Sequence, residues 1–318
     1  MGKTSIQMQS VLYCNNDKES IARTLLSVSN AVRVADEFYG LELDVTFVYG
    51  DASPIRLFSS DEIKLLQTKA GNKIEIRYYF FNENTGSARG HNVLAKETGS
   101  DYIVIMNPDV KLSPDFFYYS LMPFADSAVG IVEARQTPVE HSKEYNIKTQ
   151  ETKWATTACA MISRKVFDML GGFDADSFFL YCDDVDFSWR ARLKGYKIIY
   201  QPLALAFHDK ELSVNGKWMP TQAERYYSCF ASIMMAYKWS NDKLAVSLLR
   251  MFSESPDEYE KKAAEEFKDR QKRGTLPPQL DKEHRIAEFN DGFYCKHRYI
   301  MPVEDISYQN GDDADENC

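Results

Sequence analysis

The sequence predicts an α/β protein whose central sheet is mainly parallel and flanked by helices, with a helical extension at the C-terminus. Two observations lead to this prediction. From about residue 5 to residue 110, short β-rich runs alternate with stretches of helical periodicity, as in βαβ units. After residue 208 the pattern is helical. A chain of 318 residues with 44% hydrophobic content can bury one large core and carry an appendage.

Four strands and three helices are expected in the first part of the chain. The strands are residues 9–13, 45–49, 74–80 and 102–106. The helices are residues 17–34, 63–70 and 87–97, where apolar residues recur at helical spacing. Ligands of parallel sheets bind at the carboxyl ends of the strands, so the loops that follow these strands are the candidate site.

The second part of the chain is less regular. A strand is expected at residues 155–162 and a helix at residues 164–170. Further helices are expected at residues 222–237, 242–252 and 257–272, and the acidic residues 311–318 form a flexible tail. We divide the chain into a sheet domain, residues 1–215, whose halves meet near residue 110, and a helical extension, residues 216–318.

Composition excludes several classes of protein. The formal net charge of −9 and the pI near 5.2 argue against nucleic-acid binding, because a surface that follows phosphates needs a basic stripe. Six cysteines without CxxC spacing indicate neither a zinc site nor a disulfide framework. We find no signal-peptide pattern and no apolar stretch near the ~18 residues that span a bilayer, so a cytoplasmic protein is expected. Peripheral membrane contact and homo-oligomer formation stay open.

Three acids within four positions form the first candidate site. Asp183, Asp184 and Asp186 follow an aromatic run and precede Trp189 and Arg190. Carboxylates this close are costly in an apolar setting unless a cation, a sugar hydroxyl or backbone N–H groups take up the charge. The alternative is a solvated first helical turn, which the helix dipole favours.

A second candidate site follows the fourth strand. Asn107 and Pro108 lead to Asp109, whose carboxylate at the rim of the sheet is suited to a hard cation that also binds phosphate oxygens. An ordinary turn is the alternative. His208 ends a later apolar segment and either completes a metal shell with Asp109 or has a structural role.

The loop at residues 84–92 alternates small and polar residues where a strand gives way to a helix. Its glycines allow the backbone to approach a phosphate or a sugar closely. Their spacing differs from the GxGxxG motif of dinucleotide-binding proteins. Arg89 either pairs with a diphosphate or faces solvent.

These motifs occur in the order GDAS, NxGxAxGxN, NPDV, GGFD, FFLYxxDVDxxWR and His. In this order the chain resembles an inverting family 2 glycosyltransferase of the GT-A fold, the fold of nucleotide-diphospho-sugar transferases. It is most similar to the bacterial rhamnosyltransferase-like branch that builds surface polysaccharides. The resemblance covers about residues 7–240, and it implies a nucleotide-sugar half before residue 110 and an acceptor half after it.

The resemblance also implies a role for each matching residue. Asp184 would be the general base, and Asp109 with His208 would bind a divalent cation, Mg²⁺ or Mn²⁺. The donor would be held by Asp51, Asn84, Gly86, Gly90, Arg89, Asn92, Asn107 and Asp109. The acceptor side would comprise Asp183, Trp154, Thr157, Trp189 and Arg190. Of these, Trp189 and Arg190 would support the helix that carries the acids.

Three departures from the family pattern concern specificity. Gly50-Asp51 stands where two polar or acidic residues are usual, which leaves fewer contacts for the nucleoside. Asp183 stands where Glu is usual, and Thr157 where a small Gly is common. We therefore expect an altered acceptor site.

The function that the resemblance implies is metal-dependent transfer of a hexosyl or rhamnosyl group. The donor would be a dTDP- or UDP-linked sugar and the acceptor a saccharide or a lipid-linked molecule, in the cytoplasm at the inner face of the cell membrane. Two alternatives remain. One is a sugar-phosphate nucleotidyltransferase, although no Gly-rich motif with a following Lys lies near the first strand. The other is a non-catalytic scaffold with a degenerate site.

Overall fold

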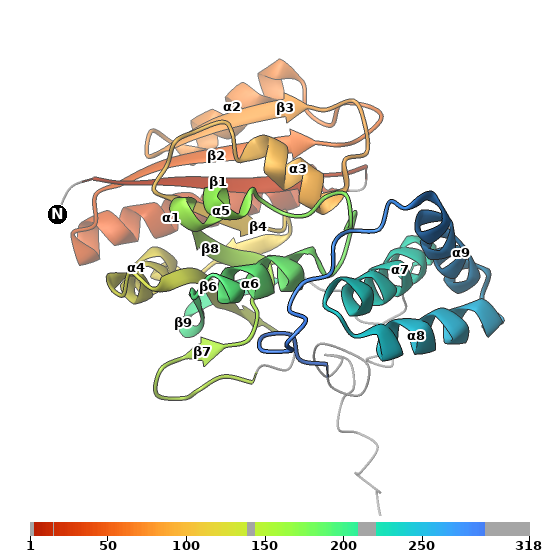
Figure 1. Ribbon diagram of the computed structural model, residues 1–318. Helices are drawn as coiled ribbons and strands as arrows, with labels where there is room; N and C mark the ends of the chain where they lie inside the picture. The colour runs from red at the N-terminus through yellow and green to blue at the C-terminus, as the bar shows by residue number, and fades with distance from the viewer. Residues whose placement is uncertain (1–2, 15, 139–143, 209–220, 290–318) are drawn as a thin grey trace, which may run out of the picture.

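The computed structural model describes residues 3–14, 16–138, 144–208 and 221–289, and these residues form one nine-stranded sheet with helices on both faces and a helical unit at one side (Figure 1). The strand order is β3-β2-β1-β4-β8-β6-β9-β5, and β7 pairs with β9. The strands are β1 Thr4–Leu12, β2 Leu43–Asp51, β3 Ile74–Phe80, β4 Tyr102–Met106, β5 Val110–Leu112, β6 Val129–Thr137, β7 Glu151–Thr152, β8 Cys159–Ser163 and β9 Lys197–His208.

The predicted fold class is confirmed. Strands β3, β2, β1 and β4 are parallel, as the alternation of strands and helices predicts. The second half of the sheet is mixed, because β8 runs antiparallel to both β4 and β6 while β6 and β9 are parallel. Sequence patterning predicted neither β6 nor β9. Pro202 interrupts β9 where its pairing register with β6 shifts, and an internal proline argues against a strand.

The helices are α1 Lys18–Tyr39, α2 Ser60–Ala70, α3 Gly86–Leu94, α4 Phe116–Leu121, α5 Arg164–Leu170, α6 Asp183–Leu193, α7 Gln222–Lys238, α8 Asp242–Glu254 and α9 Glu258–Arg273, with a 3₁₀ turn at Met122–Ala125. All of them except α4, which was not predicted, occur close to where the sequence predicts a helix. Asp17 caps α1 by accepting hydrogen bonds from the amides of Glu19 and Ser20, and Gly40 ends it in the left-handed conformation. The acidic tail and the domain boundary at residue 215 lie outside the described residues.

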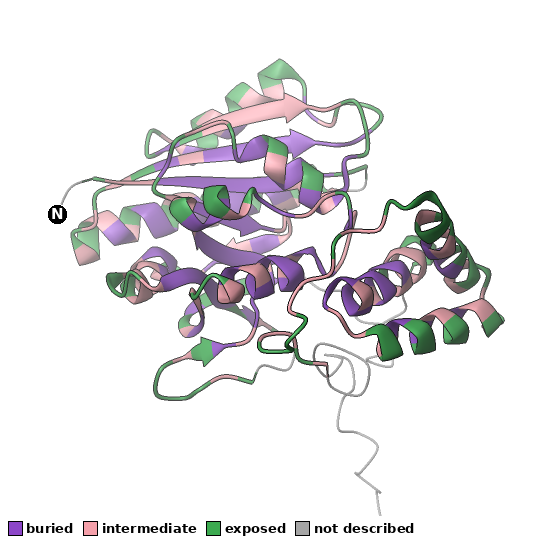
Figure 2. Cartoon of the chain, viewed as in Figure 1, coloured by how far each residue is buried: buried purple, intermediate pink, exposed green. Residues whose placement is uncertain are grey.

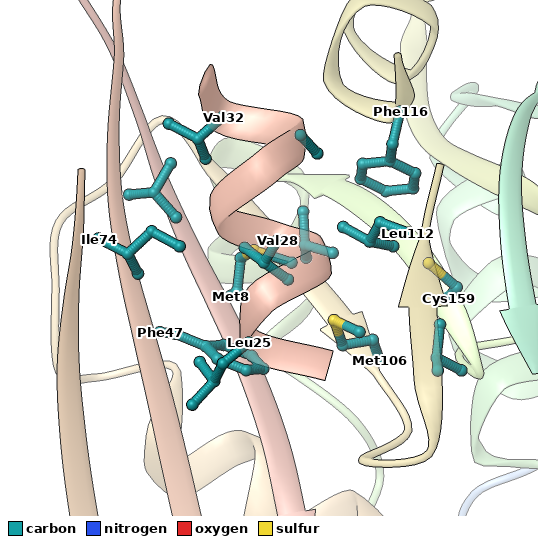
Figure 3. Packing of buried hydrophobic residues seen from close by; sticks show 14 of the residues in the cluster. Met8, Leu25, Val28, Val32, Phe47, Ile74, Met106, Leu112, Phe116 and Cys159 are labelled. Carbon is teal, nitrogen blue, oxygen red and sulfur yellow. The ribbon is translucent and has the colours of Figure 1, made fainter. Parts of the chain in front are cut away.

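The core lies on both faces of the sheet. On one face, α1 places Leu25, Val28 and Val32 against side chains of the strands, among them Met8 and Phe47 (Figure 3). On the other face, α3, α5 and α6 contribute a second apolar cluster. The central strands are consequently buried along most of their length (Figure 2). This burial fixes the carboxyl ends of β1 and β4, where the candidate site lies.

The C-terminal helices α7, α8 and α9 pack on one another around a cluster of their own, beside α6 (Figure 1). Trp189 of α6 joins this cluster and meets Trp239 edge to face, with ring centroids 5.1 Å apart. The helical unit is therefore attached to the helix that carries the acid cluster. Within the described ranges, we find no helix long and apolar enough to cross a bilayer.

Candidate active site

A hollow of about 490 Å³ opens at the carboxyl ends of β1 and β4. It is lined by Val11, Tyr13, Asn16, Asp17, Ser20, Ile21, Asn107, Pro108 and Asp109. The loop Asn107-Pro108-Asp109, called the NPD loop below, was expected at this edge of the sheet. The contribution from the end of β1 and the start of α1 was missed, although β1 pairs with β4 in parallel and so ends beside it.

The structure brings together the two predicted metal ligands. Val110 is paired with His208 between β5 and β9, and this register places Asp109 Oδ2 3.4 Å from His208 Nε2. The imidazole is 1% exposed, whereas the Asp109 side chain is 37% exposed and borders the hollow. One ligand is thus fixed in the protein and the other faces the space in which a substrate can bind.

The donor set of this pair suits a divalent cation. His208 Nδ1 lies 2.7 Å from Gln136 Oε1, which only accepts, so Nδ1 carries the proton and Nε2 presents a lone pair toward Asp109. Asn107 Nδ2 lies 3.3 Å from the same nitrogen. No group of three or more His, Cys, Asp or Glu side chains suited to a metal exists among the described residues. Such a two-residue site leaves coordination positions for phosphate oxygens and water.

The acid cluster divides into three different environments. Asp183 is 5% exposed, and burial, followed by the negative charge of Asp184, raises its pKa to about 7, while a hydrogen bond with Ser87 opposes this rise. Asp184 is half-buried, and its carboxylate accepts hydrogen bonds from the Val185 amide at 2.8 Å and the Thr157 amide at 3.4 Å. Asp184 is therefore the acid of this pair with access to solvent.

Asp186 is fully buried and neutralised by the protein. Its Oδ2 accepts from Arg190 Nε at 2.7 Å, and its Oδ1 lies 2.6 Å from Lys238 Nζ and 3.1 Å from Trp239 Nε1. Lys238 also lies 2.6 Å from Asp174 Oδ2. The third acid of the cluster, Asp186, therefore joins α6 to α7 through its ion pair with Lys238.

Two hydrogen bonds from backbone amides, one to a carbonyl and one to the Asp184 carboxylate, connect Asp184 and the NPD loop through residues 157 and 158. The Asn107 amide donates to the Ala158 carbonyl at 2.9 Å, and the neighbouring Thr157 amide donates to Asp184. The first of these bonds continues the pairing of β4 with β8, in which Cys159 lies opposite Met106. Asp184 does not line the hollow at Asp109. The backbone of residues 157 and 158 lies between Asp184 and the NPD loop.

The glycine-containing loop packs against the acid segment. Gly86 has φ of +64°, and a Cβ there would lie 2.4 Å from the Phe179 carbonyl oxygen. The Gly86 amide donates to Asn84 Oδ1 at 3.2 Å. A Cβ on Gly90 would meet Val11 at 2.7 Å. These residues bring the start of α3 close to both β1 and the segment before α6.

Several predicted contact residues are occupied by internal hydrogen bonds. Asn92 exchanges two 2.8 Å hydrogen bonds with the Phe173 backbone, which holds the GGFD turn. Asp51 is fully buried and accepts from the amides of Ser53 and Leu57 and from the Tyr78 hydroxyl. The structure thus shows both side chains holding loops beside the expected donor position.

The remaining predicted residues lie at the periphery of the site or in the core. Arg89 is exposed and pairs with Glu83 at 2.7 Å. Trp154 and Trp189 are buried in the cluster shared with α7. Arg190 donates to Asp186 and to the carbonyls of residues 170 and 172. Trp189 and Arg190 therefore contact other parts of the protein from α6, and their assignment to the acceptor side stays a prediction.

Comparison with known proteins agrees with this architecture. No protein-family model matches the chain. The poly-β-1,6-N-acetyl-D-glucosamine synthase of Staphylococcus aureus strain COL is 24% identical over an alignment of 228 residues that covers 65% of this chain and 51% of the synthase. The chain thus spans about half the length of that relative. The low-salt glycan biosynthesis hexosyltransferase Agl10 of Haloferax volcanii is 22% identical over 272 residues, 75% of this chain and 84% of Agl10.

A solved structure shows the same fold. The mannosyltransferase PcManGT from Pyrobaculum calidifontis, in complex with GDP-Man and Mn²⁺, superposes with a TM-score of 0.52 at 15% identity, over 85% of this chain and 80% of its own. The chain therefore has a GT-A-like fold: a sheet flanked by helices, followed by the C-terminal helices α7–α9.

Proposed function

We propose that the chain is an inverting glycosyltransferase that moves a sugar from a nucleotide-diphosphate donor to an acceptor hydroxyl. The observation that carries the proposal is the placement of two different sites at one edge of the sheet. Asp109 faces His208 at 3.4 Å, and Asp184 lies across the 157–158 backbone from them. Two of the similar proteins are named as a synthase of a polysaccharide and a glycan hexosyltransferase, which supports the same class.

The proposed reaction is a direct displacement. The acceptor oxygen forms a bond to the anomeric carbon while the bond from that carbon to the diphosphate oxygen breaks, and the leaving diphosphate takes the electron pair. The acceptor O–H proton passes to the Asp184 carboxylate, a general-base step worth about 10²- to 10⁴-fold. One displacement inverts the anomeric configuration, so a single carboxylate suffices.

Asp109 and His208 would hold the divalent cation, Mg²⁺ or Mn²⁺. When bound, the cation supplies positive charge next to the leaving diphosphate. PcManGT contains Mn²⁺ together with its nucleotide sugar, which supports a cation in the same role here. The hollow beside Asp109 is the proposed position of the donor, and Tyr13 at its edge offers an aromatic face.

The finer assignment follows the sequence resemblance. We propose a dTDP- or UDP-linked hexose or rhamnose as donor and a saccharide or lipid-linked molecule as acceptor, used in surface polysaccharide synthesis. The proposed location is the cytoplasm, at the inner face of the cell membrane. Asp183 and Thr157 lie beside Asp184 and are the proposed acceptor contacts.

Nucleotide binding tests the donor site. We expect UDP or dTDP to bind with Mn²⁺ and to bind weakly without it in isothermal titration calorimetry. Asp109→Ala and His208→Ala should each remove most of the metal dependence, while Asp61→Asn, at an exposed position in α2, should bind as the unaltered protein does. Absence of nucleotide binding in every condition would favour the scaffold alternative.

Turnover tests the base. Asp184→Asn keeps the shape of the side chain and should lower kcat by about 10²- to 10⁴-fold while the nucleotide Kd stays unchanged. NMR of the product should show inverted configuration at the anomeric carbon. Undiminished turnover in this variant would refute the assignment, and release of pyrophosphate from a nucleoside triphosphate and a sugar phosphate would favour the nucleotidyltransferase.

A further inference from the structure

Lys111 connects β5 to α1 at the wall of the hollow. Its ammonium nitrogen lies 3.2 Å from Ser20 Oγ and 3.1 Å from the Asp109 carbonyl oxygen. Ser20 and Asp109 both line the hollow, one from the first turn of α1 and the other from the NPD loop. The positive charge of Lys111 therefore lies next to two residues that border the proposed donor position.

The contact with Lys111 orients the Ser20 hydroxyl. An ammonium group only donates, so Ser20 Oγ accepts this bond and its own hydrogen is left for another acceptor. Within the described residues, the Ser20 hydroxyl donates to no protein atom. Thr24 and Ser27, on the same face of α1, donate instead to the carbonyls of Pro108 and Thr24. Ser20 can thus present a hydrogen-bond donor to the hollow.

The charges around the hollow show why such a donor is needed. Two of its lining residues are acidic, Asp17 and Asp109, and among the described residues none that lines it is basic. Arg23 lies 3.7 Å from Asp17 and offsets part of that charge from the surface. A nucleoside diphosphate brings several negative charges into this space, which the carboxylates repel. Lys111, behind Ser20, supplies positive charge on the side where the phosphates would lie.

Other basic side chains of α1 are directed to acids on the surface. Lys18 pairs with Glu62 at 2.6 Å, and Arg23 pairs with Glu19 at 2.7 Å. These side chains are about half exposed or more, so solvent and salt screen their charges. Lys111 is half-buried, and its contacts at the hollow are with neutral oxygen atoms. Its charge is therefore screened less at the hollow than the charges of those two residues.

We propose that Ser20 and Lys111 form a phosphate-binding pair in the donor site. The Ser20 hydroxyl donates to a phosphate oxygen of the nucleotide diphosphate, and Lys111 supplies positive charge behind it. The proposal rests on the proposed function, which places the donor in this hollow. A hydroxyl that accepts a bond from an ammonium group is a stronger donor, because hydrogen bonds in a chain polarise one another. The pair acts on the diphosphate and leaves the nucleoside to other contacts.

The test compares a nucleotide with its nucleoside in the presence of Mn²⁺. The nucleotide is UDP or dTDP, whichever binds the unaltered protein more tightly, measured by isothermal titration calorimetry, and NMR titration measures the weaker nucleoside. Ser20→Ala and Lys111→Met should each weaken nucleotide binding about tenfold, as expected for a lost hydrogen bond to a charged group, and leave nucleoside binding unchanged. A merely structural role would weaken both ligands equally.

Three further variants and the salt dependence serve as controls. Lys111→Met should make the nucleotide Kd less sensitive to NaCl, because one charge is removed. The double variant should bind more tightly than the product of the two single effects predicts, since both residues act through one contact. Ser60→Ala and Lys64→Met, at exposed positions of α2, should bind the nucleotide as the unaltered protein does.

Sugar transfer, measured separately, distinguishes failure of this pair from failure of the proposed function. If both variants weaken nucleotide binding as expected but the unaltered protein transfers no sugar, the proposed function fails and the pair stands. If the unaltered protein transfers sugar and both variants bind the nucleotide normally, the pair is overturned. Absence of any UDP or dTDP binding by the unaltered protein overturns the pair together with the donor site. If Lys111→Met does not fold, Lys111→Gln, which keeps a donor for the Asp109 carbonyl without the charge, gives the same reading.

Discussion

Lys238 connects the C-terminal helices to the acid-bearing helix, and replacing it by methionine tests that connection. Its ammonium group lies 2.6 Å from both Asp174 and Asp186, and the side chain is buried. Methionine keeps the apolar stem and removes the charge. The Asp186 carboxylate, which is fully buried, would then rely on Arg190 and Trp239.

The size of the effect can be worked from this geometry. Removing one partner of a buried ion pair costs about 3–5 kcal/mol, because the remaining charge stays in a low-dielectric interior. Arg190 remains on Asp186, so we expect Lys238→Met to lower the free energy of unfolding by about 3 kcal/mol, the lower end of this range. Adding Asp174→Asn should recover part of the loss, since Lys238 is the cation that pairs with Asp174 and the second change removes the carboxylate left without it.

Urea denaturation followed by tryptophan fluorescence measures this directly. Trp189 and Trp239 touch beside the ion pairs, so their emission reports on the same region. Lys243→Met, at an exposed position of α8, is the matched control and should change stability by less than about 0.5 kcal/mol. A Lys238→Met variant as stable as this control would refute the reasoning, as would a double variant that loses the sum of both single effects.

Three further predictions concern the donor-side loop and its helix. Gly86→Ala should destabilise the protein by more than about 2 kcal/mol in urea denaturation, because φ is +64° and the new Cβ meets the Phe179 carbonyl; full stability would show that the contact relaxes. Asn92→Ala should cost about 1–3 kcal/mol by the same measurement through two lost hydrogen bonds to Phe173, and no change in the urea midpoint would contradict this. Burial lowers the pKa of His91 to about 3, so the unfolded chain binds a proton first as pH falls. Stability should therefore decrease by about 1.4 kcal/mol per unit below pH 6.5, and a flat urea midpoint from about pH 6 to about pH 4 would oppose it.

Acid sensitivity should also change at the Lys238 cluster. Burial alone would raise the pKa of Asp174, but the charge and hydrogen bond of Lys238 lower it below its usual value. A carboxylate with a lowered pKa adds stability at neutral pH, and that contribution is lost as the pH falls through its folded-state pKa. This part of the acid dependence should be smaller in Lys238→Met than in the unaltered protein.

Local patterns were sufficient for the first half of the fold. Helix α1 follows from apolar residues at helical spacing between Asp17, which caps it, and Gly40, which ends it. The parallel strands β1, β2, β3 and β4 follow from the alternation with helices. Strand β9 could not be predicted in this way. It contains Pro202, and its pairing with β6 is long-range and irregular. Contacts between distant segments therefore determine this strand, and local periodicity does not reveal it.

The candidate site was predictable where its residues follow strands. Asp109 lies after β4, and the structure brings it to His208, which ends β9. The environments within the acid cluster could not be separated by local pattern, because Asp183, Asp184 and Asp186 lie within four positions of one another. The family resemblance distinguished Asp184 from Asp183 but gave no role to Asp186. Their difference comes from Lys238, more than 50 residues later, and from burial. Tyr13 was also missed, because its place in the hollow follows from the pairing of β1 with β4 and not from a local motif.

Helix α6 presents Asp184 near the sheet edge while its other side carries Trp189 into the aromatic cluster beneath α7. A chain that stopped after β9 would leave this indole and its neighbours in water, and the exposed apolar surface would promote aggregation. Helix α6 and the helices α7–α9 therefore share one apolar cluster through Trp189. Any shortened form intended for crystallisation or catalysis should retain α7 through Trp239.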